Sequence, residues 1–321
     1  MRTRGRSLRR LLSYAPVFGF TYSPLQRQAG ISAMVRVKNE EEWVQPSLLS
    51  IRDVVEEIIV VDNGSTDQTP GILKKLESQL SPKMKLFFKP VLDHVDLSNF
   101  ALSQTSYRWV LKWDADFVAH TTGPRMITKL RQRLMELPQD RHYHIHLTCV
   151  ELMGDLWHQC PGWEMRTDPF VTTFSPALQF VRVVRQMPRS ELRGWPSILR
   201  EDPNAIVTFR FEDVRLPLYY QVLEWQEPYF FHLQVKSPLR MYLRDCWSDW
   251  AENLELQNRF KCLEEYALHR ARNAWGVQTL DGAANTYMGR VRALLTPFSI
   301  ERFGEHPELL KPYLETADRQ G

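Results

Sequence analysis

Short apolar runs alternate with amphipathic stretches along the first half of the chain. Residues 57–61 form a fully apolar run, which is typical of a strand buried on both faces of a parallel sheet. Residues 143–150 alternate between apolar and polar positions and predict a half-buried strand. The predicted strands lie at 31–37, 57–61, 84–88, 108–113 and 143–150, and the predicted helices at 47–55, 72–80 and 124–137. This alternation predicts an α/β fold with a mostly parallel sheet and helices on both faces.

The pattern loosens after residue 150. Residues 154–170 are rich in Trp, Pro and Gly, and they predict a long functional loop. Strands are predicted at 180–184, 205–211 and 229–233. Residues 238–275 are predicted to be mainly helical.

Composition agrees with one large folded domain and an elaboration. The chain has 321 residues, of which 43% are hydrophobic, and a formal net charge of +3. No apolar stretch is long enough to predict a membrane-spanning helix. The four cysteines lie far apart without a CxxC pair, which favours a reducing, cytoplasmic environment over a zinc site or a disulfide framework. We expect no nucleic-acid partner.

The first 30 residues carry six arginines and no acidic residue. This basic arm has three interpretations. An Arg-rich, acid-poor start is typical of a transit peptide, whereas a surface arm of the same composition binds anionic lipid at the membrane periphery. The third interpretation is a frayed basic tail without a partner.

Two aspartates one residue apart follow the predicted strand at 108–113. Positions i and i+2 of a strand point to one face, so Asp114 and Asp116 are expected to converge. Ligands of an open α/β sheet bind outside the carboxyl ends of its strands. Two adjacent carboxylates repel each other there, and a divalent cation that also grips a diphosphate relieves this repulsion. A lone DxD is also typical of a solvated acidic turn.

A further carboxylate, Asp62, ends the buried strand at 57–61 and enters a glycine turn. It can accept a hydrogen bond from a nucleobase N–H or a ribose hydroxyl. Asp-Asn-Gly is also common turn chemistry without a ligand.

Taken together, four segments resemble family 2 glycosyltransferases of the GT-A fold. They are MVRVKNEEEWVQPSLLSI, EIIVVDNGSTDQT, DLSNFALSQTS and YRWVLKWDADF, and they lie within residues 31–120. The chain is most similar to soluble, non-processive members related to lipopolysaccharide-core transferases. Those members have a Ser-Asn or Arg-Asn pair before the DxD strand, matched here by Ser98-Asn99.

The resemblance implies three parts of the chain: the basic arm (1–30), a GT-A domain (31–235) and a helical extension (236–321). Within the domain, residues 31–120 would bind the nucleotide sugar and residues 121–235 the acceptor. The implied nucleotide-sugar-binding residues are Lys38, Asn39, Glu40, Asp62, Asn99, Asp114 and Lys236.

The resemblance also implies a metal site for Mn2+ or Mg2+. Asp116 would be a direct ligand, and Asp114 would hold metal-bound water and contact the sugar nucleotide. Family members often add a late histidine from the last strand, and His232 holds that place in the order of the chain. A lone histidine in an apolar strand is also compatible with simple packing.

The sequence departs from the family pattern at the catalytic base. Related transferases often carry a His-Glu pair downstream of the DxD, where this chain reads Trp195-Pro196-Ser197. An inverting displacement needs a carboxylate within reach of the acceptor hydroxyl. Glu191, Glu201 and Asp213 are the candidates, and the sequence does not choose between them. A glycine-rich segment before the DxD and a QxxRW motif are both missing, which argues against polyprenyl-phosphate transferases and processive synthases.

Aromatic residues gather in the variable half. Of Trp157, Trp163 and Trp195, we expect one to stack on the acceptor and the others to pack. His144 and His146 are interpreted as solvated strand histidines.

The leading prediction is metal-dependent transfer of a sugar from a nucleotide diphosphate sugar, with UDP favoured and inversion expected of a single displacement. The acceptor stays open between a glycan, a lipid-linked sugar, a small molecule and a protein. A degenerate GT-A scaffold that only binds is one alternative. Another is a haloacid-dehalogenase-type phosphatase, whose hhhhDxDxV motif fits residues 110–118, although that motif belongs on the first strand of its fold.

Overall fold

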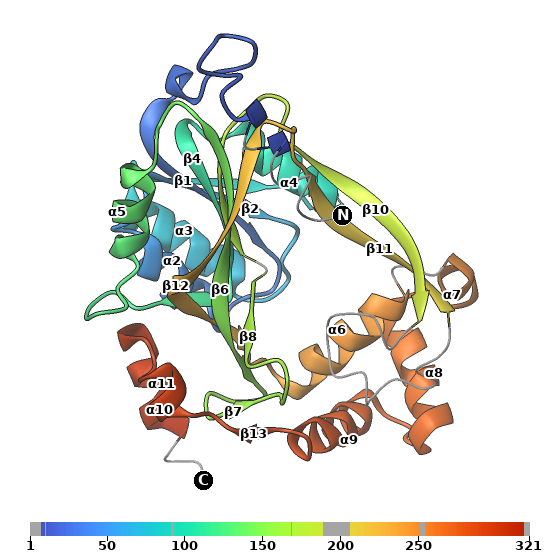
Figure 1. Ribbon diagram of the computed structural model, residues 1–321. Helices are drawn as coiled ribbons and strands as arrows, with labels where there is room; N and C mark the ends of the chain where they lie inside the picture. Colours follow the sequence, from blue (N-terminus) through green and yellow to red (C-terminus); the bar gives the residue numbers. More distant parts are fainter. Residues whose placement is uncertain are drawn as a thin grey trace.

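A nine-stranded sheet forms the centre of the molecule (Figure 1). The computed structural model describes residues 8–9, 11–90, 93–167, 169–188, 206–250 and 254–317. The strand order is β3-β2-β1-β4-β9-β6-β12-β5, with β8 paired to β6. The strands of this sheet are β1 (Gln28–Val37), β2 (Glu57–Asp62), β3 (Met84–Phe88), β4 (Tyr107–Asp114), β5 (Phe117–Ala119), β6 (His142–Met153), β8 (Met165–Arg166), β9 (Phe170–Thr173) and β12 (Tyr220–Gln234).

The sheet is mostly parallel, as predicted. Strands β3, β2, β1 and β4 are parallel neighbours, and β12 is parallel to β6. The short strands β5, β8 and β9 are antiparallel to their partners. Because β9 lies between β4 and β6, it joins the two parallel parts of the sheet.

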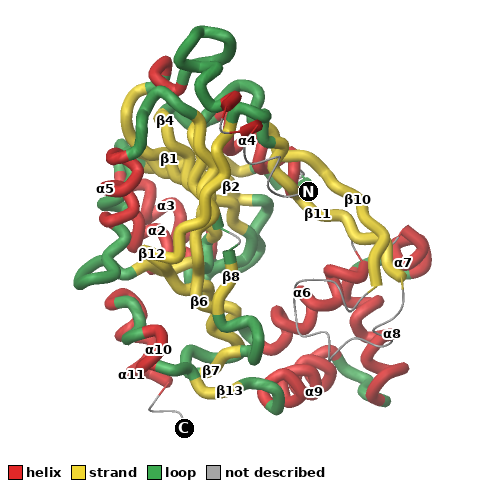
Figure 2. The backbone as a smooth tube through the Cα atoms, in the orientation of Figure 1, coloured by secondary structure: helices red, strands yellow, loops and turns green. Residues whose placement is uncertain are grey.

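Helices cover both faces of the sheet, and the alternation along β1 shows why. Ala33 and Val35 belong to the apolar cluster that contains α2 (Val44–Ile51), α3 (Thr69–Leu80) and α5 (Thr128–Glu136). Met34, which points the other way, packs in the cluster that contains α4 (His94–Ser103). Figure 2 shows α2, α3 and α5 together on one side of the strands. The predicted α/β architecture is therefore confirmed.

The half-buried character predicted for residues 143–150 is wrong. Strand β6 is buried along nearly all of its length, because it lies inside the sheet between β9 and β12. His144 is buried as well, with its ring 4.5 Å from that of Phe170, so the interpretation of a solvated histidine fails for this residue. His146 is partly buried.

Residues 154–170, predicted as a loop, contain two very short strands. β7 (His158–Gln159) pairs with β13 (Thr296–Pro297) near the C-terminal end of the chain, and β8 pairs with β6. A separate hairpin of β10 (Gln179–Pro188) and β11 (Ile206–Arg215) extends from the sheet toward α7 (Leu254–Arg259) (Figure 1).

The C-terminal part is mainly helical, as predicted, and it has a core of its own. Its helices are α6 (Pro238–Trp250), α7, α8 (Leu263–Trp275), α9 (Leu280–Arg292), α10 (Ile300–Phe303) and α11 (Lys311–Ala317). Residues of α6, α8 and α9 pack together with Met153 and Cys160. Residues near α10 and α11 instead pack against Trp43 and Phe231, so they complete the core beneath the sheet.

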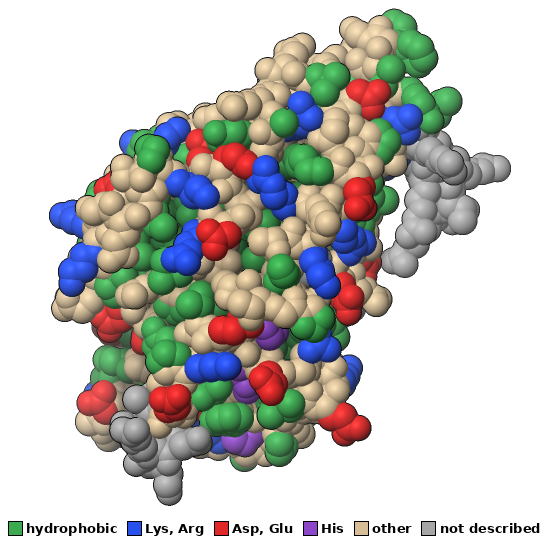
Figure 3. Space-filling view, turned by 90° about the vertical axis from the view of Figure 1, so that its left-hand side faces the viewer, with side chains coloured by type: hydrophobic (Ala, Val, Ile, Leu, Met, Phe, Trp, Pro, Cys, Tyr) green, Lys and Arg blue, Asp and Glu red, His purple; other side chains and the backbone are tan. Residues whose placement is uncertain are grey.

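None of the helices in the described ranges is long and apolar enough to cross a membrane. On the face that carries α5 and α11, acidic and basic side chains are interspersed with hydrophobic ones (Figure 3). The basic arm is partly anchored to the body. Arg9 donates to the carbonyls of Pro217 and Tyr220, and the guanidinium of Arg27 lies 3.1 Å from the ring centroid of Phe174.

Candidate active site

Asp116 lies at the centre of a buried ionic cluster at the carboxyl ends of β4 and β12. It lies in the turn between β4 and β5, and its carboxylate is 2.9 Å from Lys236 Nζ and 3.4 Å from His232 Nε2. Arg244 Nη1 is 3.8 Å away. Burial alone would raise the pKa of Asp116, but the charges of Lys236 and His232 hold it well below its usual value. The carboxylate is therefore ionised throughout the neutral pH range.

Lys236 joins this carboxylate to the end of β1. Its side chain has no exposed surface, and its Nζ also donates to both carboxylate oxygens of Glu40 at 2.7 Å. Arg240 of α6 lies 2.6 Å from Glu40 Oε1. Burial raises the pKa of Glu40, although the Lys236 ammonium acts in the opposite direction. The sequence-predicted residues Glu40, Asp116, His232 and Lys236 are thus brought together in space.

Asp114 faces a second group of cations. Lys112 Nζ donates to both of its carboxylate oxygens at 3.1 Å, and Arg36 Nη2 is 4.0 Å away. Its side chain stays 32% exposed, whereas Asp116 is buried. Burial acts to raise the pKa of Asp114, but Lys112 and Arg36 lower it below the usual value. The two aspartates of the DxD therefore offer two anionic groups at the end of one strand, one buried and one open to solvent.

The end of β2 carries an unsatisfied acceptor. Asp62 is buried, and its Oδ1 accepts a hydrogen bond from the Ser65 amide at 2.8 Å. Its Oδ2 is also buried but has no hydrogen-bond partner among the described residues. Buried polar atoms are nearly always paired, so an unpaired carboxylate oxygen indicates a donor that comes from a ligand or from water.

The loops after β1 and β2 are tied to each other beside Asp62. Asn39 has a positive φ of 55°, its amide N–H donates to Ser65 Oγ, and its Oδ1 accepts from the Thr66 amide at 2.7 Å. Lys38 is exposed, and its carbonyl accepts from Arg240. These contacts hold the loop carrying Lys38 and Asn39 against the turn after Asp62.

The two residues of the Ser98-Asn99 pair make different contacts. Both polar atoms of the Asn99 amide bind the main chain of Phe180 at 2.9 Å, so Asn99 anchors strand β10 to α4. Ser98 instead accepts a hydrogen bond from Arg36 at 2.7 Å and donates to Glu212 Oε2 at 2.5 Å. Ser98 is therefore the member of the pair that faces the ions around Asp114.

Glu212 also lies at the candidate site, although the sequence analysis did not predict it. Its carboxylate lies 2.8 Å from Arg36 Nη1, with the side chain only 15% exposed. Asp213, the predicted candidate on the same strand, is exposed, and its Oδ1 accepts from the amide of Val214. Because side chains alternate along β11, one of these two neighbours must point inward. The alternation could have been read from the sequence, but it does not say which of the two residues points inward. The other candidates, Glu191 and Glu201, and also Trp195, lie outside the described residues.

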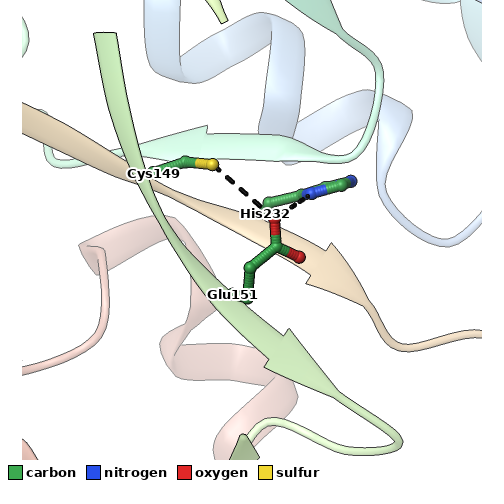
Figure 4. A group of neighbouring side chains, drawn as sticks. All are labelled: Cys149, Glu151 and His232. Atoms are coloured by element: carbon green, nitrogen blue, oxygen red, sulfur yellow. Dashed lines mark hydrogen bonds and ion pairs between the residues drawn. The ribbon is translucent and has the colours of Figure 1, made fainter. Parts of the chain in front are cut away.

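His232 is held in place from behind by Glu151. Its Nδ1 donates to Glu151 Oε1 at 2.8 Å, while its Nε2 faces Asp116. Burial lowers the pKa of His232, but the carboxylates of Glu151 and Asp116 outweigh this effect and raise it to about 9. Figure 4 shows Glu151 between His232 and Cys149, whose Sγ lies 3.7 Å from the same carboxylate oxygen.

Cys149, Glu151 and His232 do not form a convincing metal centre of their own. Their ligand atoms lie within 4.8 Å of one another. However, burial raises the pKa of the Cys149 thiol well above its usual value, which opposes the thiolate that a metal requires. Arg166 Nη1 also lies 3.6 Å from Glu151 Oε1. The group is better explained as a hydrogen-bonded support that aims His232 at Asp116, the arrangement common behind histidine ligands.

If Mn2+ binds at Asp116 and His232, as the resemblance implies, Glu151→Leu should weaken this binding at least tenfold, because outer-shell partners of metal-binding histidines typically contribute roughly 10- to 100-fold in affinity. Glu151→Gln keeps an acceptor for His232 Nδ1, so its effect should be smaller. Calorimetric titration of each variant with Mn2+ measures this, with Glu136→Gln, at an exposed position of α5, as the charge-matched control. Equal Mn2+ affinity in wild type and Glu151→Leu would show that Glu151 only supports packing.

The predicted acceptor tryptophans have different surroundings. The ring of Trp157 packs against His306 with centroids 5.1 Å apart, and its carbonyl accepts from the Phe298 amide. Trp163 lies beside Arg166, whose guanidinium is 5.4 Å from the ring centroid. Trp157 thus joins the loop at 154–170 to the C-terminal segment. Trp163 instead lies beside Arg166, which contacts Glu151, the hydrogen-bond partner of His232.

The fold and the site define an α/β domain in which carboxylates and the cationic side chains that pair with them gather at the carboxyl ends of the parallel strands. Residues 32–139 match the family model described as Glycosyl transferase family 2. This match agrees with the resemblance seen in the sequence.

Curated relatives match a little over a quarter of the chain. An uncharacterized glycosyltransferase of Rickettsia typhi is 40% identical over 86 residues, which are 27% of this chain and 27% of that protein. An uncharacterized glycosyltransferase of Rickettsia prowazekii is 38% identical over 86 residues, with the same shares. The chain spans about a quarter of the length of the curated relatives it matches.

Solved structures are more distant. The mannosyltransferase PcManGT from Pyrobaculum calidifontis, in complex with GDP-Man and Mn2+, has a TM-score of 0.40 at 15% identity, covering 98% of this chain and 95% of that chain. TarS residues 1–349 of S. aureus, in complex with UDP-GlcNAc, has a TM-score of 0.37 at 17% identity, covering 76% and 74%.

Proposed function

We propose that this protein is a metal-dependent glycosyltransferase that moves a sugar from a nucleotide diphosphate sugar to an acceptor hydroxyl. The observation that carries the proposal is the buried Asp116 carboxylate, which meets His232 and Lys236 at the end of β4 inside a family 2 domain. Asp62, at the end of β2, would accept the N–H of the base through its unpaired Oδ2. A uridine nucleotide suits a single acceptor, because uracil presents one N–H at its pairing edge.

The donor set fits Mn2+ or Mg2+. Asp114 and Asp116 offer carboxylate oxygens, which hard divalent cations prefer, and His232 Nε2 adds a nitrogen that favours Mn2+. When bound, the metal supplies positive charge that stabilises the departing diphosphate. Lys236, which in this structure pairs with Asp116 and Glu40, would turn toward a phosphate oxygen while it keeps its contact with Glu40.

The base of an inverting displacement has four candidates in this proposal. Glu212 joins Glu191, Glu201 and Asp213, since its carboxylate lies in the ion group of Arg36 and Asp114. A single displacement by an acceptor hydroxyl that one carboxylate deprotonates inverts the anomeric centre. The phosphatase alternative is not retained, because residues 32–139 match a glycosyltransferase family.

Donor turnover tests the proposal directly. The full chain with Mn2+ should release UDP or GDP from a panel of UDP-glucose, UDP-N-acetylglucosamine and GDP-mannose, slowly with water and faster with an acceptor. EDTA should stop this release. Tight binding of a nucleotide diphosphate without release from any donor, in the presence of saccharide acceptors, would favour the binding scaffold instead.

We also propose a cytoplasmic protein whose first 20 residues contact the membrane surface. In the described part of this segment Leu11, Phe18 and Phe20 are exposed, the last two at 69% and 81%, and the sequence of the arm contains six arginines. Aromatic side chains and arginines together suit an anionic lipid surface. The four cysteines are all free, which suits a reducing compartment.

Replacing Leu11, Phe18 and Phe20 by serine should lower binding to phosphatidylglycerol vesicles by at least about a hundredfold, because each apolar side chain contributes up to about 1.5–3 kcal/mol when it is fully buried and these three are buried in part at the membrane surface. Co-sedimentation measures this, with phosphatidylcholine vesicles as the uncharged comparison. Phe88→Ser is the matched control, since Phe88 is 46% exposed on the body of the protein. Wild-type protein that stays in the supernatant with both lipids would exclude this contact.

A further inference from the structure

A cavity of about 480 Å³ lies on β6, β8 and β12, beyond the residues that match the family model. Trp163 and Arg166 form one side of it, and Glu224 and Gln226 of β12 form the other. Thr148 of β6 lies between them. This volume is within the range of small-molecule sites, about 300–1,000 Å³.

The strand register places this cavity beside the proposed donor site. Lys112 pairs with Phe170, Phe170 with His146, and His146 with Glu224, so these four residues form one row across the sheet on the same face. Asp114 lies two residues beyond Lys112 on β4, and Thr148 lies two residues beyond His146 on β6. Asp114 and Thr148 therefore lie on the same face of the sheet as Glu224. Their strands, β4 and β6, are separated by β9, so their backbones are about 10 Å apart at the usual strand spacing.

A chain of contacts also links the cavity to Asp116. Arg166, from the cavity wall, lies 3.6 Å from Glu151, and Glu151 accepts from His232 at 2.8 Å. The other nitrogen of His232 faces Asp116. The cavity and the ions at Asp114 and Asp116 are therefore linked through neighbouring side chains at the same end of the sheet.

The chemistry of the wall indicates a neutral saccharide. Trp163 offers an aromatic surface on which a sugar ring can stack. Thr148, Glu224 and Gln226 offer hydrogen-bonding groups for hydroxyls. Among the described lining residues, Arg166 and Glu224 carry opposite charges, and Glu151 lies 3.6 Å from Arg166, so these residues offer a phosphorylated ligand no excess of positive charge.

We propose that this cavity binds the acceptor and that the acceptor is a neutral glycan, with one ring stacked on Trp163 and hydroxyls bound to Glu224 and Gln226. This inference rests on the proposed transferase function only in calling the glycan an acceptor. Saccharide binding at Trp163 is testable without any donor.

The test uses the full, fluorescently labelled chain on an array of neutral, phosphorylated and uronic-acid oligosaccharides. Wild-type protein should bind at least one neutral glycan. Trp163→Ala should reduce that signal at least tenfold, and Glu224→Gln several-fold. Glu224 is exposed, so its substitution keeps the test valid if Trp163→Ala fails to fold.

Trp275→Ala is the matched control. Trp275 has Arg290 at 5.3 Å from its ring centroid and packs against the same helical core as Trp163, but it belongs to α8 and not to the cavity. Its glycan binding should equal that of the wild type.

Binding of anionic glycans alone, an unchanged signal in both cavity variants, or no glycan binding at all would overturn the inference. Calorimetry with UDP and Mn2+ separates the two proposals. Loss of glycan binding with intact nucleotide binding in Trp163→Ala supports the cavity assignment, whereas a wild type that binds glycan but no nucleotide contradicts only the transferase proposal.

Discussion

Asp116→Asn should abolish metal-dependent nucleotide binding and sugar transfer while the protein stays folded. The substitution removes the only buried carboxylate of the DxD, so the loss should exceed the roughly 10- to 100-fold expected for an outer-shell partner. Folding should survive because Lys236 keeps its 2.7 Å contact with Glu40. Calorimetry with UDP and with GDP, each in Mn2+ and in EDTA, measures the effect.

The control for this variant is Asp53→Asn. Asp53 has a largely exposed side chain and a surface contact with Arg52, so its substitution makes the same change of charge far from the ionic cluster. It should bind nucleotide like the wild type. If Asp116→Asn binds UDP as wild type does in both Mn2+ and EDTA, the metal site is not at Asp116.

The second large effect is expected at Asp62. Asp62→Asn keeps an oxygen for the Ser65 amide but replaces the unpaired, charged Oδ2 by an NH2 group, which meets the base N–H as donor against donor. A hydrogen bond to a charged group contributes about 1.5–3 kcal/mol, so UDP affinity should fall by roughly 10- to 150-fold. The melting temperature should change little, since the unpaired oxygen contributes nothing to folding.

Glu57→Gln, at the other end of the same strand, should show the reverse. Its carboxylate is buried and accepts from Ser32, Ser106 and Lys85, so the substitution removes charge from a fully bonded group. We expect a lower melting temperature and an unchanged UDP affinity. Parallel loss of nucleotide binding in both variants would mean that β2 supports the site only through the fold.

Comparing UDP with GDP in the same titrations addresses the choice of base. If Asp62 accepts a single N–H, UDP should bind more tightly than GDP, and the difference should shrink in Asp62→Asn. A preference for GDP that survives the substitution would show that other residues read the base.

The proposed donor and acceptor sites lie in different parts of the chain. The ions at Asp62, Asp114 and Asp116 lie at the ends of β2 and β4, inside the residues that match the family, whereas the Trp163 cavity lies outside them. Loops and short strands on a rigid sheet commonly carry specificity. Substitutions around Trp163 are therefore expected to change the acceptor without changing the nucleotide.

The sequence by itself determined the elements and the places of the main carboxylates. Apolar runs and helical spacing are local properties, so the strands at 57–61 and 84–88 could be predicted closely, whereas the helix predicted at 47–55 spans Val44–Ile51. The same local logic placed Asp62 and the DxD at strand ends, where an α/β sheet binds its ligands.

Only the tertiary structure decided which charges meet. Lys236 lies 120 residues from Asp116 along the chain, and Glu151 lies 81 residues from His232, so no local pattern announces either pair. The inward turn of Glu212 in place of Asp213 depends on how the β10–β11 hairpin packs on α4. The insertion of antiparallel β9 between β4 and β6 brings the cavity within two strands of Asp114, and pairing between distant strands depends on long-range packing that periodicity does not encode.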